Sequence, residues 1–190
     1  MLVCIIGMHG VGRSQDAYKL VSANDIVSMR LMGTSTLHDW EMDAKDVAGD
    51  ARFVFRSGSK TDLTSLPSLS FTLHVKDLKS DSKGLDKNVY KALKSDEHKD
   101  IRYEVTSSKL SPETGGYLLK AKGKLTIAGV TRDMDMDVHC VVNTNGTITC
   151  KGKAALKMTD YKVEPPTFMF GAMSTGDALQ LDFTVVYKKA

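Results

Sequence analysis

The segment GTSTLHDWEM, residues 33–42, brings together serine, histidine and aspartate, the three side-chain types of a hydrolase triad. A serine nucleophile needs a histidine within hydrogen-bonding distance, and that histidine needs a carboxylate to orient it. The alternation in this segment instead predicts a β-strand, on which Ser35 and His38 point to opposite faces. The G-x-S-x-G turn of α/β-hydrolases is also missing around Ser35. We therefore expect no catalytic triad here and no enzyme activity.

Two other chemical patterns are weak. Gly7, Gly12, Arg13 and Ser14 fit a phosphate-binding loop, except that arginine stands where the loop needs lysine. The residues after them predict a poor helix, and no β-α-β pattern follows, so we expect no nucleotide site. No group of His, Cys, Asp or Glu residues has the spacing of metal ligands. The sequence therefore predicts neither a metal nor a cofactor.

The chain of 190 residues has 42% hydrophobic residues and a net charge of +3, with both signs spread along its length. Such a mild charge argues against nucleic acid as a partner. Residues 1–16 begin with an apolar run and resemble the remnant of a secretory signal peptide, although a basic start is missing. A structured first strand is the alternative. We expect residues 17–190 to form a single domain.

The segments 117–127 and 132–142 alternate most regularly between apolar and charged residues, which predicts two half-buried strands. Folding the chain at Gly129–Val130 sets Lys124 opposite Asp135 on the outer face, while apolar residues pair inside. A slip of one residue would spoil both faces at once. The charged ladder is therefore interpreted as a solvated face that fixes the register, rather than as an ion site.

The next turn, at Asn143–Gly146, sets Cys140 opposite Cys150 on neighbouring strands. Both thiols then face inward. They could be two buried free cysteines, or they could form a cross-strand disulfide in an oxidising compartment.

The same period-two pattern recurs along the chain and predicts eight or nine strands, whereas residues 85–95 alone predict a helix. Many long antiparallel strands with one helix indicate a closed barrel or a sandwich, and the length of the strands favours the barrel. Small inward residues such as Gly123 and Gly152, with flexible Met134 and Met136, suggest an open apolar cavity. A tapered, filled core explains the same mixture, and the pattern alone leaves both open.

Several blocks of the sequence resemble the YceI-like family, over about residues 17–189. They are GTSTLHDW at 33–40, VYKALKSDEHKDIRYEV at 89–105, GKLTIAGVTRDMDM at 123–136 and LKMTDYKVEPPTFMFG at 156–171. The resemblance implies a mostly β fold: a lipocalin-like, eight-stranded antiparallel β-barrel with one short α-helix. It also implies a periplasmic or secreted protein that binds a polyisoprenoid or another long-chain amphiphilic lipid inside the barrel, with no catalytic residues to carry over.

On this interpretation, inward aromatic, aliphatic and methionine side chains form the wall that contacts the lipid tail. The candidate ligand-binding residues are His38, Trp40, Met42, Phe53, Phe71, Leu73, Tyr103, Leu119, Met136, Met158, Phe168, Phe170 and Phe183. Pro165 and Pro166 cannot sit in a central strand, so residues 160–173 are expected to form a loop near the barrel mouth, as a lid or as a plug.

Three functions remain in competition. A lipid carrier or storage protein is favoured, and it requires a continuous apolar interior. A structural or interaction module of the cell envelope would have a filled barrel, with Gly123 and Gly152 covered by large neighbours. A lipid hydrolase would need a converging nucleophile and base, which the sequence does not show. A homodimer is compatible with each of them.

Overall fold

The computed structural model describes residues 14–22, 28–168 and 173–190. Strands dominate the described chain, and the helical elements are short. The elements are, in order, β1 (Ser14–Leu20), β2 (Ser28–Ser35), β3 (Trp40–Ala44), β4 (Val47–Phe55), β5 (Leu63–His74), the 3-10 helix η1 (Val75–Asp77), β6 (Leu78–Lys79), α1 (Lys83–Ala92), β7 (Asp100–Glu113), β8 (Gly116–Ile127), β9 (Val130–Val142), β10 (Ile148–Lys157), the 3-10 helix η2 (Thr159–Tyr161), β11 (Thr167–Phe168) and β12 (Met173–Lys189).

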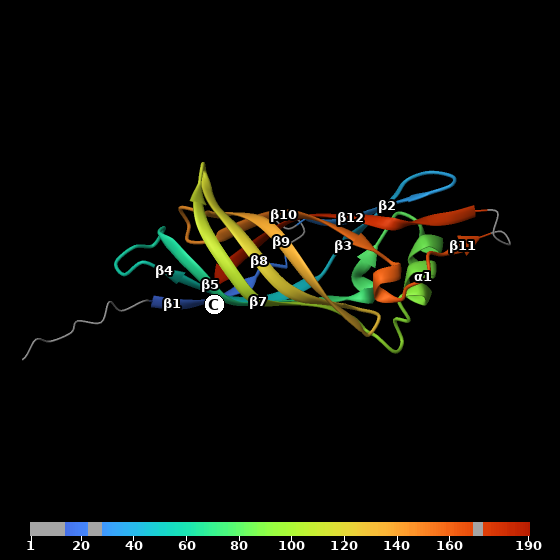
Figure 1. The fold of residues 1–190 in the computed structure, drawn as a ribbon, viewed down its shortest axis with the longest axis horizontal. Coiled ribbons are helices and arrows are strands. Elements are labelled where there is room, and N and C mark those ends of the chain that lie inside the picture. The colour runs from blue at the N-terminus through green and yellow to red at the C-terminus, as the bar shows by residue number, and fades with distance from the viewer. Residues whose placement is uncertain (1–13, 23–27, 169–172) are drawn as a thin grey trace, which may run out of the picture.

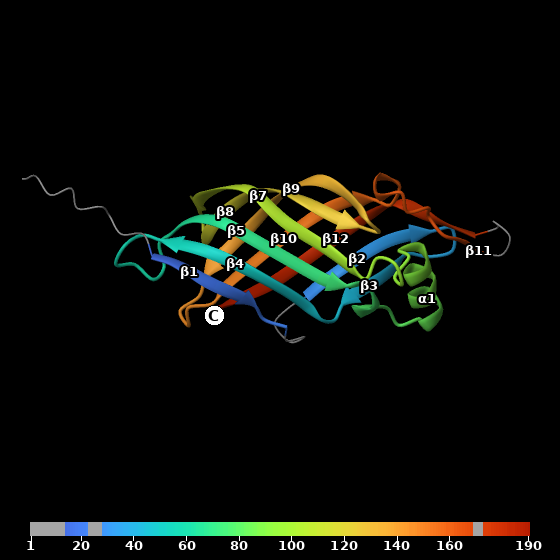
Figure 2. The same cartoon turned by 90° about the horizontal axis from the view of Figure 1, so that it is seen from below.

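Eight of these strands form a closed ring in the order β1-β4-β5-β7-β8-β9-β10-β12, and β12 returns to pair with β1. Every pairing in the ring is antiparallel. Closure removes the free edges that an open sheet of this size would expose. The prediction of an eight-stranded antiparallel barrel is thus confirmed, and Figures 1 and 2 show it elongated along one axis.

The two ends of the barrel differ. Strands β2, β3 and β6 extend the sheet beyond β12, so that β2 pairs with β12 along Thr175–Thr184 and β1 pairs with it along Tyr187–Lys189. Helix α1 lies at the end that holds β2, β3 and β11, opposite the end where β1 begins (Figure 1). Below we call these the helix end and the β1 end.

Helix α1 begins after Ser82, whose side-chain oxygen accepts a hydrogen bond from the backbone N–H of Leu85. It spans Lys83–Ala92, whereas the sequence pattern predicted residues 85–95. None of its residues is fully buried, although its apolar stripe packs against the core. The helix is therefore a cover over the helix end and no part of the barrel wall.

The ladder between β8 and β9 has the predicted faces but a different register. The structure pairs Lys124 with Asp133, and not with Asp135, which is a shift of two residues. The cause is a tight two-residue turn at Ala128 and Gly129, both with positive φ, as type I′ hairpins require. A shift of two keeps each side chain on its face, so the inside–outside prediction was correct although the partners were wrong.

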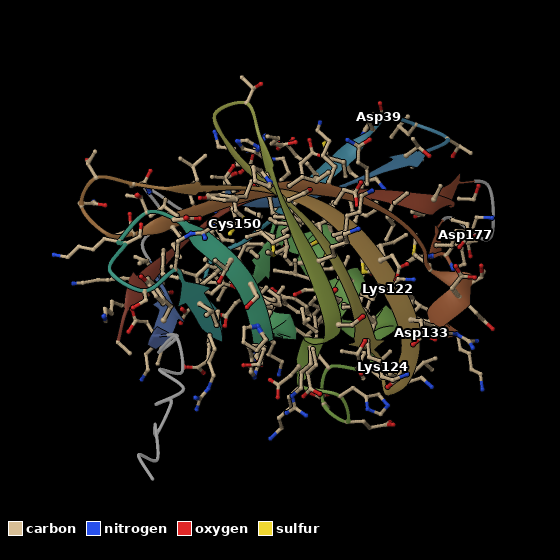
Figure 3. All side chains as sticks on the ribbon, turned by 60° about the vertical axis from the view of Figure 1, so that its left-hand side comes forward. Asp39, Lys122, Lys124, Asp133, Cys150 and Asp177 are labelled. Carbon is tan, nitrogen blue, oxygen red and sulfur yellow. The ribbon has the colours of Figure 1, made fainter. Side chains whose placement is uncertain are left out.

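Ion pairs lie on the outer face of these two strands. The Nζ atoms of Lys120, Lys122 and Lys124 lie 3.0, 3.3 and 2.9 Å from carboxylate oxygens of Asp137, Asp135 and Asp133 respectively. Figure 3 labels three of these exposed side chains on the outer face of the barrel. Exposed pairs of this kind contribute only about 0–1 kcal/mol each. These lysine and aspartate side chains form a solvated outer face, as the sequence indicated.

The inward glycines are covered by aromatic rings. A Cβ atom added to Gly123 would lie 2.5 Å from the Tyr103 ring, and one added to Gly152 would lie 2.5 Å from the Phe183 ring. At these two positions the filled alternative holds, because rings on adjacent strands fill the space that the missing side chains leave.

Strand β1 begins at Ser14, before the predicted domain boundary at residue 17, and Asp16 is the register partner of Phe53 on β4. The rest of the predicted signal-peptide remnant lies outside the described residues, as does most of the phosphate-loop pattern. Among the helices of the described ranges, none has the length and apolar character needed to cross a bilayer.

Substituting Gly123 tests the aromatic cover. We expect Gly123→Ala to lower the free energy of unfolding by about 1–3 kcal/mol, because the new methyl group would overlap the Tyr103 ring and also the Glu104 carbonyl oxygen at 2.5 Å. Urea unfolding followed by circular dichroism measures the change.

Gly84→Ala in α1 is the matched control. The nearest atom to its new methyl group is the Ser82 hydroxyl oxygen at 3.6 Å, so stability should stay constant or rise by up to about 1 kcal/mol. Equal losses in the two variants would contradict the cover at Gly123.

Candidate ligand cavity

An aromatic cluster closes the interior at the β1 end. The Phe53 ring meets the rings of Tyr18 and Tyr187 edge-on, with ring centroids 5.2 and 5.7 Å apart. Phe53 is completely buried, and Phe55 packs beside Tyr18. Such edge-to-face contacts stabilise by about 0.5–1.5 kcal/mol each beyond their burial. The cluster forms the floor of the space above it.

A cavity of about 200 Å³ runs from this floor toward α1. Its lining is almost entirely aliphatic, aromatic and methionine side chains contributed by the barrel strands, β2, β3, α1 and the η2 region. Dry apolar cavities of about 150 Å³ can hold a small hydrocarbon, so this space has room for part of an apolar molecule. Binding sites for small molecules typically combine such a lining with a few polar groups.

At the helix end, α1 presents Leu85, Asn88, Val89 and Ala92 to the cavity, which is one stripe of the helix. Tyr90 holds the helix in place from its other side. The Tyr90 hydroxyl oxygen lies 2.7 Å from the carbonyl oxygen of Leu78 on β6, and it accepts a hydrogen bond from the Lys79 side chain at 2.9 Å. The sequence-predicted helical stripe therefore becomes a wall of the cavity.

Most of the candidate ligand-binding residues meet around this cavity. The residues among them that line it are Trp40, Phe53, Phe71, Leu73, Tyr103, Leu119, Met136, Met158 and Phe183. Their contact with a ligand stays a prediction. Phe170 and the side chain of Phe168 lie outside the part of the chain that the structure describes.

His38 does not belong to this wall. Residues 36–39 form the turn of a hairpin between β2 and β3, and the His38 side chain is exposed. The prediction of one continuous strand through 33–42 was wrong. The argument that Ser35 and His38 lie on opposite faces of that strand was therefore wrong as well. Ser35 and His38 are close, but the Ser35 hydroxyl donates to the His38 backbone oxygen at 2.7 Å, and not to the imidazole.

Met42 lies on the buried side of its strand, as predicted, but it is not among the residues that line the cavity. It is almost wholly buried, with 1% of its surface exposed, and it fills the core. Its strand, β3, lies outside the ring of eight and continues the sheet beyond β2.

Sequence reasoning missed Met29 and Leu31 on β2, which line the cavity. The hairpin turn reverses the phase of the alternation: odd-numbered residues point inward on β2, and even-numbered residues such as Trp40 and Ala44 do so on β3. A strand assumed to continue through the turn therefore assigns β2 the wrong face. Recognising the turn would have identified both residues.

Segment 158–166 closes part of the helix end. Tyr161 and Val163 are buried, and Pro166 lines the cavity with them. Pro165 and Pro166 stand outside the strands, where their missing N–H groups interrupt no ladder. The expectation of an irregular segment near the mouth is confirmed for these residues.

Cys140 and Cys150 are register partners, as predicted, and both are buried free thiols with sulfur atoms 3.2 Å apart. The hydrogen bond with Cys140, reinforced by burial, raises the pKa of the Cys150 thiol well above its ordinary value. Cys150 also lines the cavity. Cys150 is therefore held as a neutral thiol at the floor of the cavity. Elsewhere in the described ranges, no group of three His, Cys, Asp or Glu side chains is placed to hold a metal ion.

The ionisation of Tyr103 reports how dry the cavity is. Burial raises the pKa of its hydroxyl to about 12, and burial raises the pKa of Tyr187 as well. A group whose pKa is raised on folding stabilises the fold below its unfolded pKa near 10, and this contribution is lost as the pH rises toward 12.

We expect a spectroscopic titration of the folded protein to show Tyr103 and Tyr187 still protonated at pH 11. Under denaturing conditions all tyrosines should ionise near pH 10. Replacing Tyr103 with phenylalanine should remove one late-titrating group. If every tyrosine of the folded protein ionised near pH 10, the cavity would be filled with water.

The fold and the cavity together define the class: a closed eight-stranded antiparallel β-barrel with an apolar interior, an aromatic floor and a helical cover. The sequence profile of the YceI-like domain matches residues 18–187, which is most of the chain, so the protein belongs to the YceI-like family. No curated protein is similar enough in sequence to count as a relative.

Solved structures share this fold at low sequence identity. BcnA from Burkholderia cenocepacia superposes with a TM-score of 0.67 at 16% identity, over 84% of this chain and 95% of BcnA. A polyisoprenoid-binding domain from Saccharophagus degradans gives 0.68 at 10% identity, over 92% and 99% of the two chains. The YceI protein of Campylobacter jejuni gives 0.58 at 16% identity, over 100% and 92%. These likenesses establish the fold.

Proposed function

We propose that this protein binds a long-chain, polyisoprenoid-like amphiphilic lipid in the apolar cavity, as a carrier or storage protein that performs no catalysis. The observation that carries the proposal is the continuous apolar lining between the aromatic floor and α1. The Saccharophagus degradans neighbour, described as a polyisoprenoid-binding domain, adds support from the same fold.

The cavity must widen to accept such a ligand. Its volume of about 200 Å³ is below the range of about 300–1,000 Å³ typical of small-molecule sites. Four methionines, Met29, Met134, Met136 and Met158, line the cavity. Methionine side chains have several rotatable bonds and change conformation at little cost, so they can move aside for a hydrocarbon chain.

A filled-barrel structural or interaction module of the cell envelope is the second candidate. The observation that favours it is the cover of Gly123 and Gly152 by aromatic rings, which leaves less space than the small residues suggested. The two candidates differ in one measurable property, since only the first takes up an amphiphile. For either candidate we propose a periplasmic or secreted location, testable by cell fractionation, and a homodimer, testable by light scattering.

Filling the cavity should abolish uptake of the ligand. We expect Ala92→Phe to weaken binding of a fluorescent long-chain amphiphile, cis-parinaric acid, by at least tenfold, because the ring would project from α1 into the cavity. A tenfold loss corresponds to about 1.4 kcal/mol. Fluorescence titration of the purified, delipidated protein measures it.

Lys91→Phe is the matched control, since Lys91 is the exposed neighbour of Ala92 on the same helix. Its affinity should stay within about twofold of the unaltered protein, a difference below about 0.5 kcal/mol. Equal affinities for the two variants would place the amphiphile outside the cavity and would reject the proposed function.

A further inference from the structure

The wall of the barrel is not hydrogen-bonded along its whole length. Strands β9 and β10 pair only from Ile148 with Val142 to Gly152 with Val138. Continuing that register toward the helix end would pair residues 153–157 of β10 with residues 133–137 of β9, but these pairs are absent from the ladder. We call these two facing edges the seam.

On its other edge, β9 is paired with β8 from Val130 to Cys140, and β10 is paired with β12 along its entire length. Both strands therefore continue as strands through the seam with one edge satisfied and the other free. Free strand edges carry N–H and C=O groups that need water or another partner.

A second stretch of the ring also lacks ladder pairs, since β5 and β7 pair only from Ser70 with Glu104 to His74 with Asp100. Across that gap the Ser108 hydroxyl donates a hydrogen bond to the Leu66 backbone oxygen at 2.6 Å.

A groove on the outside of the barrel, about 500 Å³ in volume, lies over the seam and is lined by residues of both strands. Five residues line both this groove and the internal cavity: Met134, Met136, Leu156, Lys157 and Tyr161. The groove and the cavity are thus separated at the seam by side chains alone, with no backbone ladder between them.

The ends of the seam are fixed. At the β1 end it stops at the last ladder pair, Gly152 with Val138. At the helix end the Arg132 guanidinium donates a hydrogen bond from Nε to the backbone oxygen of Asp160 at 2.9 Å, which ties β9 to η2. The seam is therefore a window of limited length in the barrel wall, and two flexible methionines stand among the side chains that fill it.

We propose that the seam between β9 and β10 is the lateral passage through which a long-chain amphiphile enters and leaves the cavity. The hydrocarbon tail passes between Met134, Met136 and Leu156, and the polar end stays at the seam. There the free strand-edge groups, with Arg132 and Lys157 beside them, offer hydrogen bonds to it. This inference rests on the proposed function and specifies the route by which the ligand reaches its site.

Other routes require more disruption. On the wall opposite, β4, β5, β7 and β8 are joined by ladders that reach the helix end. Passage through the unpaired stretch of β5 and β7, toward the β1 end, would break the Ser108 hydrogen bond to Leu66. The β1 end is closed by the aromatic cluster around Phe53. Passage beneath α1 would require release of the Tyr90 hydrogen bonds to β6. At the seam, only side-chain rotations are needed.

A reversible covalent bridge across the seam tests this route. Asp135 and Ala155 would face each other if the ladder continued, and both are exposed. The double variant Asp135→Cys with Ala155→Cys is bridged by oxidation or by a short bis-maleimide. Stopped-flow fluorescence then measures the association and dissociation rates of cis-parinaric acid.

We expect the bridge to slow association and dissociation by the same factor, at least tenfold, while the dissociation constant stays within twofold. Equal slowing of both rates is the signature of a blocked passage, since an altered binding site changes their ratio instead. Reducing the disulfide should restore both rates.

The matched control bridges a position where the ladder is intact. His139→Cys with Lys151→Cys joins two register partners on the same outer face. Its bridge should change neither rate. Unchanged rates in the seam variant, with binding intact, would overturn the lateral passage and leave the proposed function standing. Failure of the unaltered protein to bind the probe would reject the proposed function itself.

Hydrogen exchange provides a measurement that needs no substitution. In the ligand-free protein, seam-facing amides of residues 133–137 and 153–157 should exchange faster than the paired amides of residues 138–142. Binding of cis-parinaric acid should slow them. Equal protection of both groups from exchange in the ligand-free protein would show that β9 and β10 are hydrogen-bonded to each other along the seam. That result would overturn the inference.

Discussion

Strand β12 is the constraint on which the architecture depends, because one of its edges is shared by two partners. It pairs with β2 along Thr175–Thr184 and with β1 along Tyr187–Lys189. A strand edge can hydrogen-bond to only one partner at each position, so β1 and β2 must follow each other along β12. The ring of eight therefore closes at the β1 end, while at the helix end the sheet continues into β2, β3 and β6 and needs α1 as a cover.

Because of this asymmetry, the two ends of the interior differ in what closes them. At the closed end, Tyr18, Phe53 and Tyr187 fill the barrel with edge-to-face rings. At the covered end, a helix with no fully buried residue presents a single apolar stripe to the cavity. A tail can lie against the aromatic floor, and the polar end of an amphiphile is left near the helix end or at the seam. Because β12 pairs with β1 along one part of its edge and with β2 along another, the barrel closes at one end only. The position of the cavity and the proposed orientation of the ligand follow from this.

Alternation of residue types predicted much of this, because the side-chain period of a strand is fixed at two. It assigned the inner and outer faces of β8, β9 and β10 correctly, and it placed Cys140 beside Cys150. It could not choose between registers that differ by two residues, since both keep the same faces. The register of β8 and β9 was set instead by the conformation of Ala128 and Gly129.

Other features left no such trace in the sequence. The turn at residues 36–39 reversed the phase of the alternation, so His38 was placed inside and Leu31 was overlooked. The glycines were compatible with open space and with a filled core, and only the structure shows that rings from neighbouring strands cover them. The seam was invisible, because alternation reports which face a residue occupies and carries no information about whether its backbone is paired. Cavity and passage are properties of packing between strands, which single-strand patterns do not encode.

The most direct test of the central claim is native mass spectrometry of the protein purified without detergent, followed by organic extraction and lipid identification. The account predicts one long-chain amphiphile per chain, lost on collisional activation and recovered in the extract. A bare protein that also takes up no added polyprenyl or fatty-acyl lipid would contradict it. The barrel would then be a filled structural module, and its apolar cavity a packing defect without a ligand.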